Sequence, residues 1–202
     1  IKDKVSSKEV TALEKFEDYE KTAEYWFYLG YYYYEAGMHK EATEAFKQAI
    51  RIKPDLAEAH YNLGLAYYDL DMYREAIEAF KHAIRIKPDD AEAHYNLGLA
   101  YYNLDMYREA IEAYKQAIRI KPDYAEAHNN LGVAYYILGM YREAMEAYKQ
   151  AIRIKPNLAE AHYGLGLAYL LLGDRGSALE QYKILKVLDS ELANRLFNLI
   201  YK

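Results

Sequence analysis

Residues 91–124 read AEAHYNLGLAYYNLDMYREAIEAYKQAIRIKPDY, and this stretch recurs along the chain with a period of 34 residues. Residues 57–90 differ from it at only four positions. A third close copy spans 125–158, and looser copies span 23–56 and 159–192. A fixed period of roughly 20 to 50 residues is typical of repeat proteins, in which each unit stacks on the next. We therefore predict five tandem units over residues 23–192.

Each copy predicts two helices joined by a short turn. The first helix of 91–124 carries apolar positions at helical spacing, His94, Leu97, Tyr101 and Leu104. The second helix carries Ala110, Ile111, Tyr114, Ala117, Ile118 and Ile120. Pro122 ends the second helix, because the residue before a proline is disfavoured in helical geometry. Asp105 lies in the turn, and the matching Gly37, Gly139 and Gly173 favour a left-handed backbone there.

Three segments carry a resemblance to a known family: AEAHYNLGLAYY at 91–102, YREAIEAY at 107–114 and AIRIKP at 117–122. They closely resemble the tetratricopeptide repeat, and the resemblance covers residues 23–192. It implies an all-α fold, a right-handed superhelical array of antiparallel helix-turn-helix units. The family's usual tryptophan occurs here once, as Trp26, and histidine takes its place in the later copies, at His60, His94, His128 and His162.

Both ends of the array are expected to be capped, because a repeat array otherwise exposes an apolar face at each end. Residues 1–22 predict an N-terminal capping helix, which Ser6–Glu9 opens with a capping box. At the other end we expect Ser190 to cap a last helix that continues through 193–202. Its apolar residues would cover the fifth unit: Leu192, Leu196, Leu199 and Ile200.

The composition excludes several classes of partner. The formal net charge is -5, so there is no basic excess to neutralise nucleic acid phosphates. No apolar run approaches the roughly 20 residues that span a bilayer, which predicts no direct membrane insertion. Cysteine is absent, which fits a reducing compartment. We expect a cytoplasmic protein that does not bind nucleic acid.

No arrangement of side chains predicts catalysis or a metal site. The four recurring histidines lie on separate hairpins, and neighbouring helices pack about 8 to 10 Å apart, so the histidines cannot converge on one ion. The recurring Glu58, Glu92, Glu126 and Glu160 fail as an acid and base pair for the same reason. We expect no metal, no cofactor and no enzymatic activity.

Differences between near-identical copies point instead to a binding surface. Three of the seven differences between 91–124 and 125–158 are spaced i, i+4 and i+8 on the first helix, at Tyr95/Asn129, Leu99/Val133 and Asn103/Ile137. In the tetratricopeptide family this stripe lines the concave groove. We therefore expect the following peptide-binding residues: Asn62, Asn96, Asn130, Tyr61, Tyr95, Tyr163, Leu65, Leu99, Val133, Leu167, Tyr68, Tyr102, Tyr136, Glu35, Asp69, Asn103, Ile137 and Leu171.

The asparagines of this set resemble the ladder found in some tetratricopeptide superhelices, including that of the O-linked N-acetylglucosamine transferase. A side-chain amide both donates to and accepts from a peptide backbone. The last position of the stripe runs from acidic through neutral to apolar: Glu35, Asp69, Asn103, Ile137 and Leu171. We expect a ligand that is basic at one end and apolar at the other.

The function that follows is a non-catalytic scaffold or adaptor that binds an extended or helical peptide segment of another protein. Two alternatives stay open. The array pairs with itself as a homo-oligomeric structural protein, or it is the accessory domain of a larger enzyme.

Overall fold

The computed structural model describes residues 22–202, so the predicted N-terminal capping helix lies outside the described residues. The described chain is helical without a strand and divides into two compact units, one ending at Leu104 and the other spanning Asp105–Lys202. Unit 1 contains α2 (Ala23–Glu35), α3 (His39–Ile52), α4 (Ala57–Asp69), α5 (Tyr73–Ile86) and α6 (Ala91–Asn103). Unit 2 contains α7 (Tyr107–Ile120), α8 (Ala125–Ile137), α9 (Tyr141–Ile154), α10 (Ala159–Leu171), α11 (Arg175–Leu188) and α12 (Ser190–Ile200).

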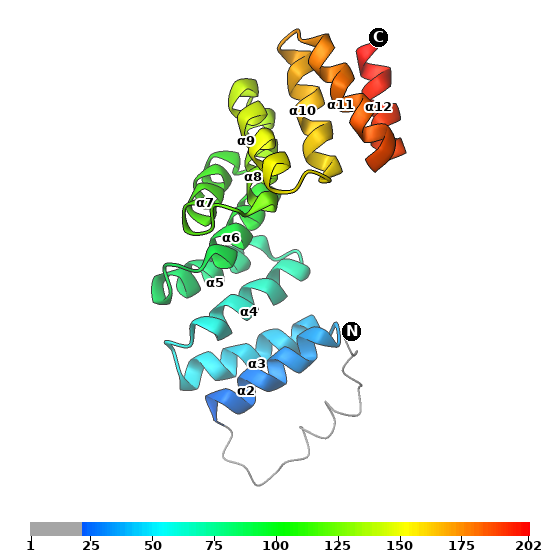
Figure 1. Ribbon diagram of the computed structural model, residues 1–202. Coiled ribbons are helices and arrows are strands. Elements are labelled where there is room, and N and C mark those ends of the chain that lie inside the picture. Colours follow the sequence, from blue (N-terminus) through cyan, green and yellow to red (C-terminus); the bar gives the residue numbers. More distant parts are fainter. Residues whose placement is uncertain (1–21) are drawn as a thin grey trace. The chain divides into compact units, whose positions relative to one another are not determined.

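Within each unit the helices form antiparallel hairpins that stack in chain order (Figure 1). We call α2, α4, α6, α8 and α10 the first helices, and α3, α5, α7, α9 and α11 the second helices. In unit 1 each first helix also contacts the next one, α2 with α4 and α4 with α6. In unit 2, α8 contacts α10 in the same way. The first helices are therefore packed from several sides.

The second helices have one apolar face, as their spacing predicts. In α5 the buried residues are Ala76, Ile77, Ala79, Phe80 and Ala83. They recur every three to four residues and form a stripe toward the first helices. Lys87, which precedes Pro88, has left the helical region at φ -129° and ψ 85°, so the proline ends α5 at the predicted place.

The turns inside the hairpins have the predicted left-handed backbone. Gly37, Gly139 and Gly173 have φ between 74° and 82°, and Asp71 and Asp105 have φ 58° at the matching positions. Glycine adopts this conformation without a steric penalty, whereas aspartate adopts it at some cost. In unit 1 the Asp71 carboxylate also accepts a hydrogen bond from the Tyr73 hydroxyl at 2.6 Å.

Glycines on the first helices allow an aromatic ring of the second helix to approach the backbone. A Cβ added at Gly64 would lie 2.5 Å from Cε1 of Phe80, and one added at Gly30 would lie 2.7 Å from the Phe46 ring. Both rings are fully buried. These close contacts fix the spacing of the two helices in each hairpin of unit 1.

The last helix covers the end of unit 2, with two differences from the sequence prediction. Ala193, Leu196 and Ile200 are buried against α10 and α11, but Leu199 lies at the edge of this apolar face and is 43% exposed. The N-cap is Asp189, not Ser190. Asp189 Oδ1 accepts hydrogen bonds from the backbone N–H groups of residues 191 and 192, at 2.9 and 3.0 Å. Ser190 is already the first helical residue.

Candidate peptide-binding surface

The predicted binding residues lie on one side of each first helix, and we call this surface the predicted binding face. Helical residues turn about 100° each, so Asn62, Leu65 and Asp69 of α4 share one side. His60 and Leu63 lie on the opposite side of α4 and are buried. The predicted binding face is therefore distinct from the side of α4 that packs into the core.

In unit 1 the predicted binding face is partly open to solvent. Glu35, Asp69 and Asn103 are exposed, and the other predicted residues of α4 and α6 are half-buried, namely Tyr61, Asn62, Leu65, Tyr68, Tyr95, Asn96, Leu99 and Tyr102. Tyr28 of α2 is 57% exposed and occupies the position that Asn62 and Asn96 hold in the next copies. Tyr28 was not among the predicted residues, although the 34-residue period that identifies the asparagines places it in the same series.

The asparagine amides of unit 1 already use their N–H groups within the protein. Asn96 Nδ2 donates to the Tyr61 hydroxyl at 2.9 Å and to the backbone oxygen of Glu92 at 3.0 Å. Asn103 Nδ2 donates to the Tyr68 hydroxyl at 2.8 Å and to the backbone oxygen of Leu99 at 3.0 Å. An amide nitrogen has two hydrogens, so both are engaged in each case. These side chains offer a ligand their carbonyl oxygens.

The remaining polar contacts of unit 1 follow the same pattern. The Tyr34 hydroxyl donates to Asp69 Oδ2 at 2.6 Å, and burial together with this bond raises the pKa of Tyr34. Burial raises the pKa of Tyr61 to about 12. Asn62 Nδ2 donates to the backbone oxygen of Glu58 at 2.8 Å. Tyrosine hydroxyls of one first helix thus form hydrogen bonds with polar side chains of the next first helix. The sequence pattern did not predict this network.

The first helices of unit 1 carry no positive charge. No lysine or arginine occurs in α2, α4 or α6. The same helices contain five acidic residues: Glu24, Glu35, Glu58, Asp69 and Glu92. The lysines and arginines of the described part of unit 1 lie on the second helices and in the loops, as at Lys47, Arg51 and Arg74. The predicted binding face of unit 1 is therefore a surface of hydrogen-bond acceptors with negative charge.

In unit 2 the last position of the corresponding face is apolar, while Glu126 and Glu160 keep the carboxylates that Glu58 and Glu92 provide in unit 1. Ile137 is 43% exposed and Leu171 is 51% exposed, while Val133, Tyr136, Tyr163 and Leu167 are half-buried. Asn130 differs from the asparagines of unit 1, because its Oδ1 accepts a hydrogen bond from Asn129 Nδ2 at 3.2 Å. Asn129 stands where unit 1 has Tyr61 and Tyr95. The asparagine ladder therefore changes its hydrogen bonding between the units.

Gly164 ends the asparagine series, and the Tyr148 ring lies against its backbone. A Cβ at Gly164 would lie 2.4 Å from Cζ of Tyr148, a contact that a side chain does not tolerate without movement of the ring. Tyr148 also packs against Gly132, where an added Cβ would lie 2.7 Å from Cε1. The tyrosine ring thus lies close to both glycines.

The recurring histidines have a structural role. His60 Nε2 lies 2.9 Å from the backbone oxygen of Pro54, and His94, His128 and His162 make the same contact with the preceding proline at 3.0, 3.1 and 2.9 Å. Each bond joins a first helix to the turn before it. Among the described residues, no group of three or more histidines and carboxylates has the geometry to hold a metal ion.

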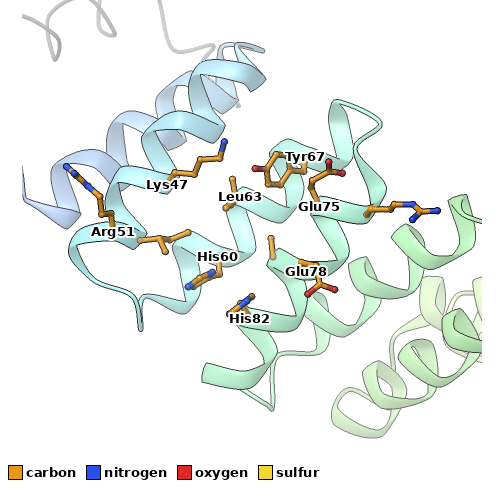
Figure 2. Close-up of a pocket in the computed structure, with 11 residues that line it drawn as sticks. Lys47, Arg51, His60, Leu63, Tyr67, Glu75, Glu78 and His82 are labelled. Atoms are coloured by element: carbon orange, nitrogen blue, oxygen red, sulfur yellow. The ribbon is translucent and has the colours of Figure 1, made fainter.

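Three cavities of the described units lie on the other side of the first helices, between second helices or beside them. Residues at matching positions of the repeat line all three, and the sequence patterns did not single them out. The largest of the three, about 670 Å³, lies between α3 and α5 with α4 as its floor (Figure 2). We call it the α3–α5 groove. It is lined by Lys47, Ile50, Arg51, His60, Leu63, Tyr67, Arg74, Glu75, Glu78, Ala79 and His82.

Comparison with known proteins identifies the repeat. A family model described as TPR repeat matches residues 30–71, 72–105, 106–139 and 134–173. Comparison with curated protein sequences gave no match. No helix in the described part of the chain is long and apolar enough to cross a membrane.

Solved structures agree with the family model. A crystal structure of MamA is 32% identical, with a TM-score of 0.78, and the match covers 82% of this chain and 97% of MamA. MamA from Desulfovibrio magneticus RS-1 is 22% identical, with a TM-score of 0.78 and coverage of 84% and 96%. YrrB, described as a TPR protein with an unusual peptide-binding site, is 22% identical, with a TM-score of 0.79 and coverage of 96% and 99%. The chain belongs to the tetratricopeptide (TPR) repeat family.

Proposed function

We propose that this protein is a scaffold that binds a peptide segment of another protein on the predicted binding face of its first helices. The observation that carries the proposal is the chemistry of unit 1. Its first helices expose carboxylates and amide oxygens and carry no lysine or arginine. Such a surface favours ligands with N–H donors and positive charge, and disfavours carboxylates and phosphates.

The ligand segment at unit 1 is therefore a basic peptide. Glu35 and Asp69 are exposed and attract lysine or arginine side chains, while Asn96 and Asn103 offer carbonyl oxygens to backbone N–H groups. Exposed Tyr28 and Tyr31 provide ring faces that also attract cations. Attraction between exposed charges is screened by salt, so binding at unit 1 weakens as ionic strength rises.

Unit 2 binds a segment of different character. Its first helices expose Ile137 and Leu171 at the positions where unit 1 has Glu35 and Asp69. Contact with these side chains removes apolar surface from water, at roughly 25 cal/mol per Å². A peptide with leucine or another aliphatic residue fits this surface.

Self-association is the second candidate function, because exposed Ile137 and Leu171 would also be covered by a second copy of the chain.

Fluorescence anisotropy with labelled synthetic peptides tests the proposal. We expect a peptide with lysines followed by leucines to bind, and a peptide with glutamates in place of the lysines to bind at least about tenfold more weakly. The variant Glu35→Lys/Asp69→Asn should lose most of this preference. Asparagine is a safe replacement at position 69, because Asn103 holds the matching position in the next copy. There its side chain forms a hydrogen bond with the hydroxyl of Tyr68, the counterpart of Tyr34.

A matched control distinguishes local contacts from net charge. Asp55→Lys/Asp89→Asn changes the net charge by the same amount at two exposed residues of the turns, and we expect it to bind like the natural protein. Equal binding of both peptides to the natural protein would contradict the proposal. Sedimentation of the protein without peptide tests self-association, which predicts a mass that rises with protein concentration.

A further inference from the structure

The α3–α5 groove has an apolar floor that the predicted binding face does not share. His60, Leu63 and Tyr67 of α4 form this floor and lie about one turn apart. The His60 ring of this floor stacks on the His82 ring of α5, with centroids 5.2 Å apart and planes 12° apart. Burial lowers the pKa of His60, and its Nε2 is hydrogen-bonded to the Pro54 oxygen. The floor therefore consists of flat rings and aliphatic surface along about 10 Å of α4.

Some charged side chains on the two walls of the groove are held in ion pairs, and others are not. Lys47 is paired with Glu44 at 2.7 Å and lies over the Tyr67 ring, and Glu78 is paired with Lys81 at 3.1 Å. Arg51 and Arg74, in contrast, have no ion-pair partner among the residues that the structure describes. Glu75 adds one unpaired carboxylate, so the unpaired charge of the groove is cationic.

The two arginines lie at opposite ends of the floor. Arg51 belongs to the last turn of α3, close to the start of α4, and Arg74 belongs to the first turn of α5, close to the end of α4. In Figure 2, Arg51 and Glu75 lie on opposite sides of Leu63, and Arg74 is the residue before Glu75 in α5. A ligand that covers the floor meets a guanidinium group at each end.

We propose that the α3–α5 groove is a second docking site, and that its occupant is an acidic amphipathic helix of a partner protein. Aliphatic side chains of this helix lie over Leu63 and Tyr67, and carboxylates about two turns apart pair with Arg51 and Arg74. An amphipathic helix presents its apolar residues at i, i+3 or i+4, and i+7, the same interval that the floor spans. The groove is an open trough, which suits a helix better than an enclosed small molecule.

This site is independent of the proposed function and selects the opposite charge. The predicted binding face of unit 1 has no cation, whereas the groove lies among the lysines and arginines of the second helices. The cavity at the matching place in unit 2 is about 440 Å³ and is lined by residues of α8 and α9 alone. No residue of α7 lines that cavity, although Arg119 of α7 holds the repeat position of Arg51. The unit 2 cavity therefore differs from the α3–α5 groove by its smaller volume and by Gln150 in place of His82.

A single introduced cysteine gives a local test, because the chain contains no cysteine. An environment-sensitive dye is attached at Glu75→Cys in the groove, or at Glu143→Cys at the matching position of unit 2. The probe is a synthetic helical peptide of about 14 residues with leucines on one face and glutamates two turns apart. We expect a saturable signal from the dye at 75, and roughly tenfold weaker binding at 143.

Charge-reversal variants show whether the peptide pairs with the two groove arginines or is attracted only by the net charge of the protein. Arg51→Glu/Arg74→Glu should weaken binding at the dye on 75 by about tenfold or more, and a peptide with lysines in place of the glutamates should recover it. Lys53→Glu/Lys202→Glu changes the net charge equally at exposed residues outside the groove and should bind normally. Unchanged binding by the arginine variant, or no saturable signal at 75, would overturn the proposal. So would a signal that depends on protein concentration without peptide, because it would place a second copy in the groove.

Discussion

At the scale of single residues, the hairpins of unit 1 depend on glycines that meet aromatic rings. Gly64→Ala places a Cβ 2.5 Å from the Phe80 ring, which is fully buried and has no room to move. We expect the free energy of unfolding to fall by about 1 to 3 kcal/mol, as is usual for overpacking. Urea unfolding followed by circular dichroism measures the change.

Gly176→Ala in α11 is the matched control for this substitution. The nearest atom to an added Cβ there is Asp174 Oδ1 at 3.5 Å, an ordinary contact. Alanine is a better helix former than glycine by about 1 kcal/mol, so this variant should be as stable as the natural protein or more stable. Similar losses from both substitutions would show that contact with the ring is not the cause.

At the scale of helices, the ends are set by particular caps. Asp189→Ala removes the oxygen that accepts two backbone N–H groups of α12, and we expect it to lower the free energy of unfolding by about 1 kcal/mol. Ser190→Ala should change it by only a few tenths, because Ser190 is inside the helix. Thermal unfolding of the two variants compares them. A larger loss from Ser190→Ala would contradict the assignment of Asp189 as the cap.

Sequence patterns predicted these elements well because each pattern has a local cause. The proline at 88 and the left-handed turn at Asp71 act on the backbone at their own positions, so the helix ends followed from sequence alone. The cap at Asp189 was missed because serine and aspartate are both good capping residues and stand side by side. The spacing of apolar residues does not show which of these two neighbours is the N-cap of α12.

The chemistry of the surface was less predictable, because it depends on contacts between copies. The periodic spacing identified Asn96 but not its bond to the Tyr61 hydroxyl, 35 residues away. Without that bond the amide appeared able both to donate and to accept. The sequence does not reveal the α3–α5 groove for a related reason: its residues are nearly constant between copies, and the differences between copies point only to the first helices.

At the scale of the whole molecule, positive charge is absent from the first helices. Those of unit 1 are acidic and those of unit 2 expose Ile137 and Leu171, while the lysines and arginines of residues 22–202 lie on second helices, outside the helices and on α12. A net charge of -5 does not reveal this separation. The separation supports two docking surfaces with opposite preference, one for basic peptides and one for acidic helices.

The most direct test of the central claim is an NMR titration that follows the side-chain amides of Asn62, Asn96 and Asn103 while a lysine-and-leucine peptide is added. We expect these amide signals to shift in a saturable way, because N–H groups of the peptide donate to the asparagine carbonyl oxygens. Signals from the α3–α5 groove should stay in place. Saturable shifts confined to the groove, or no shift at any asparagine, would contradict peptide binding on the first helices.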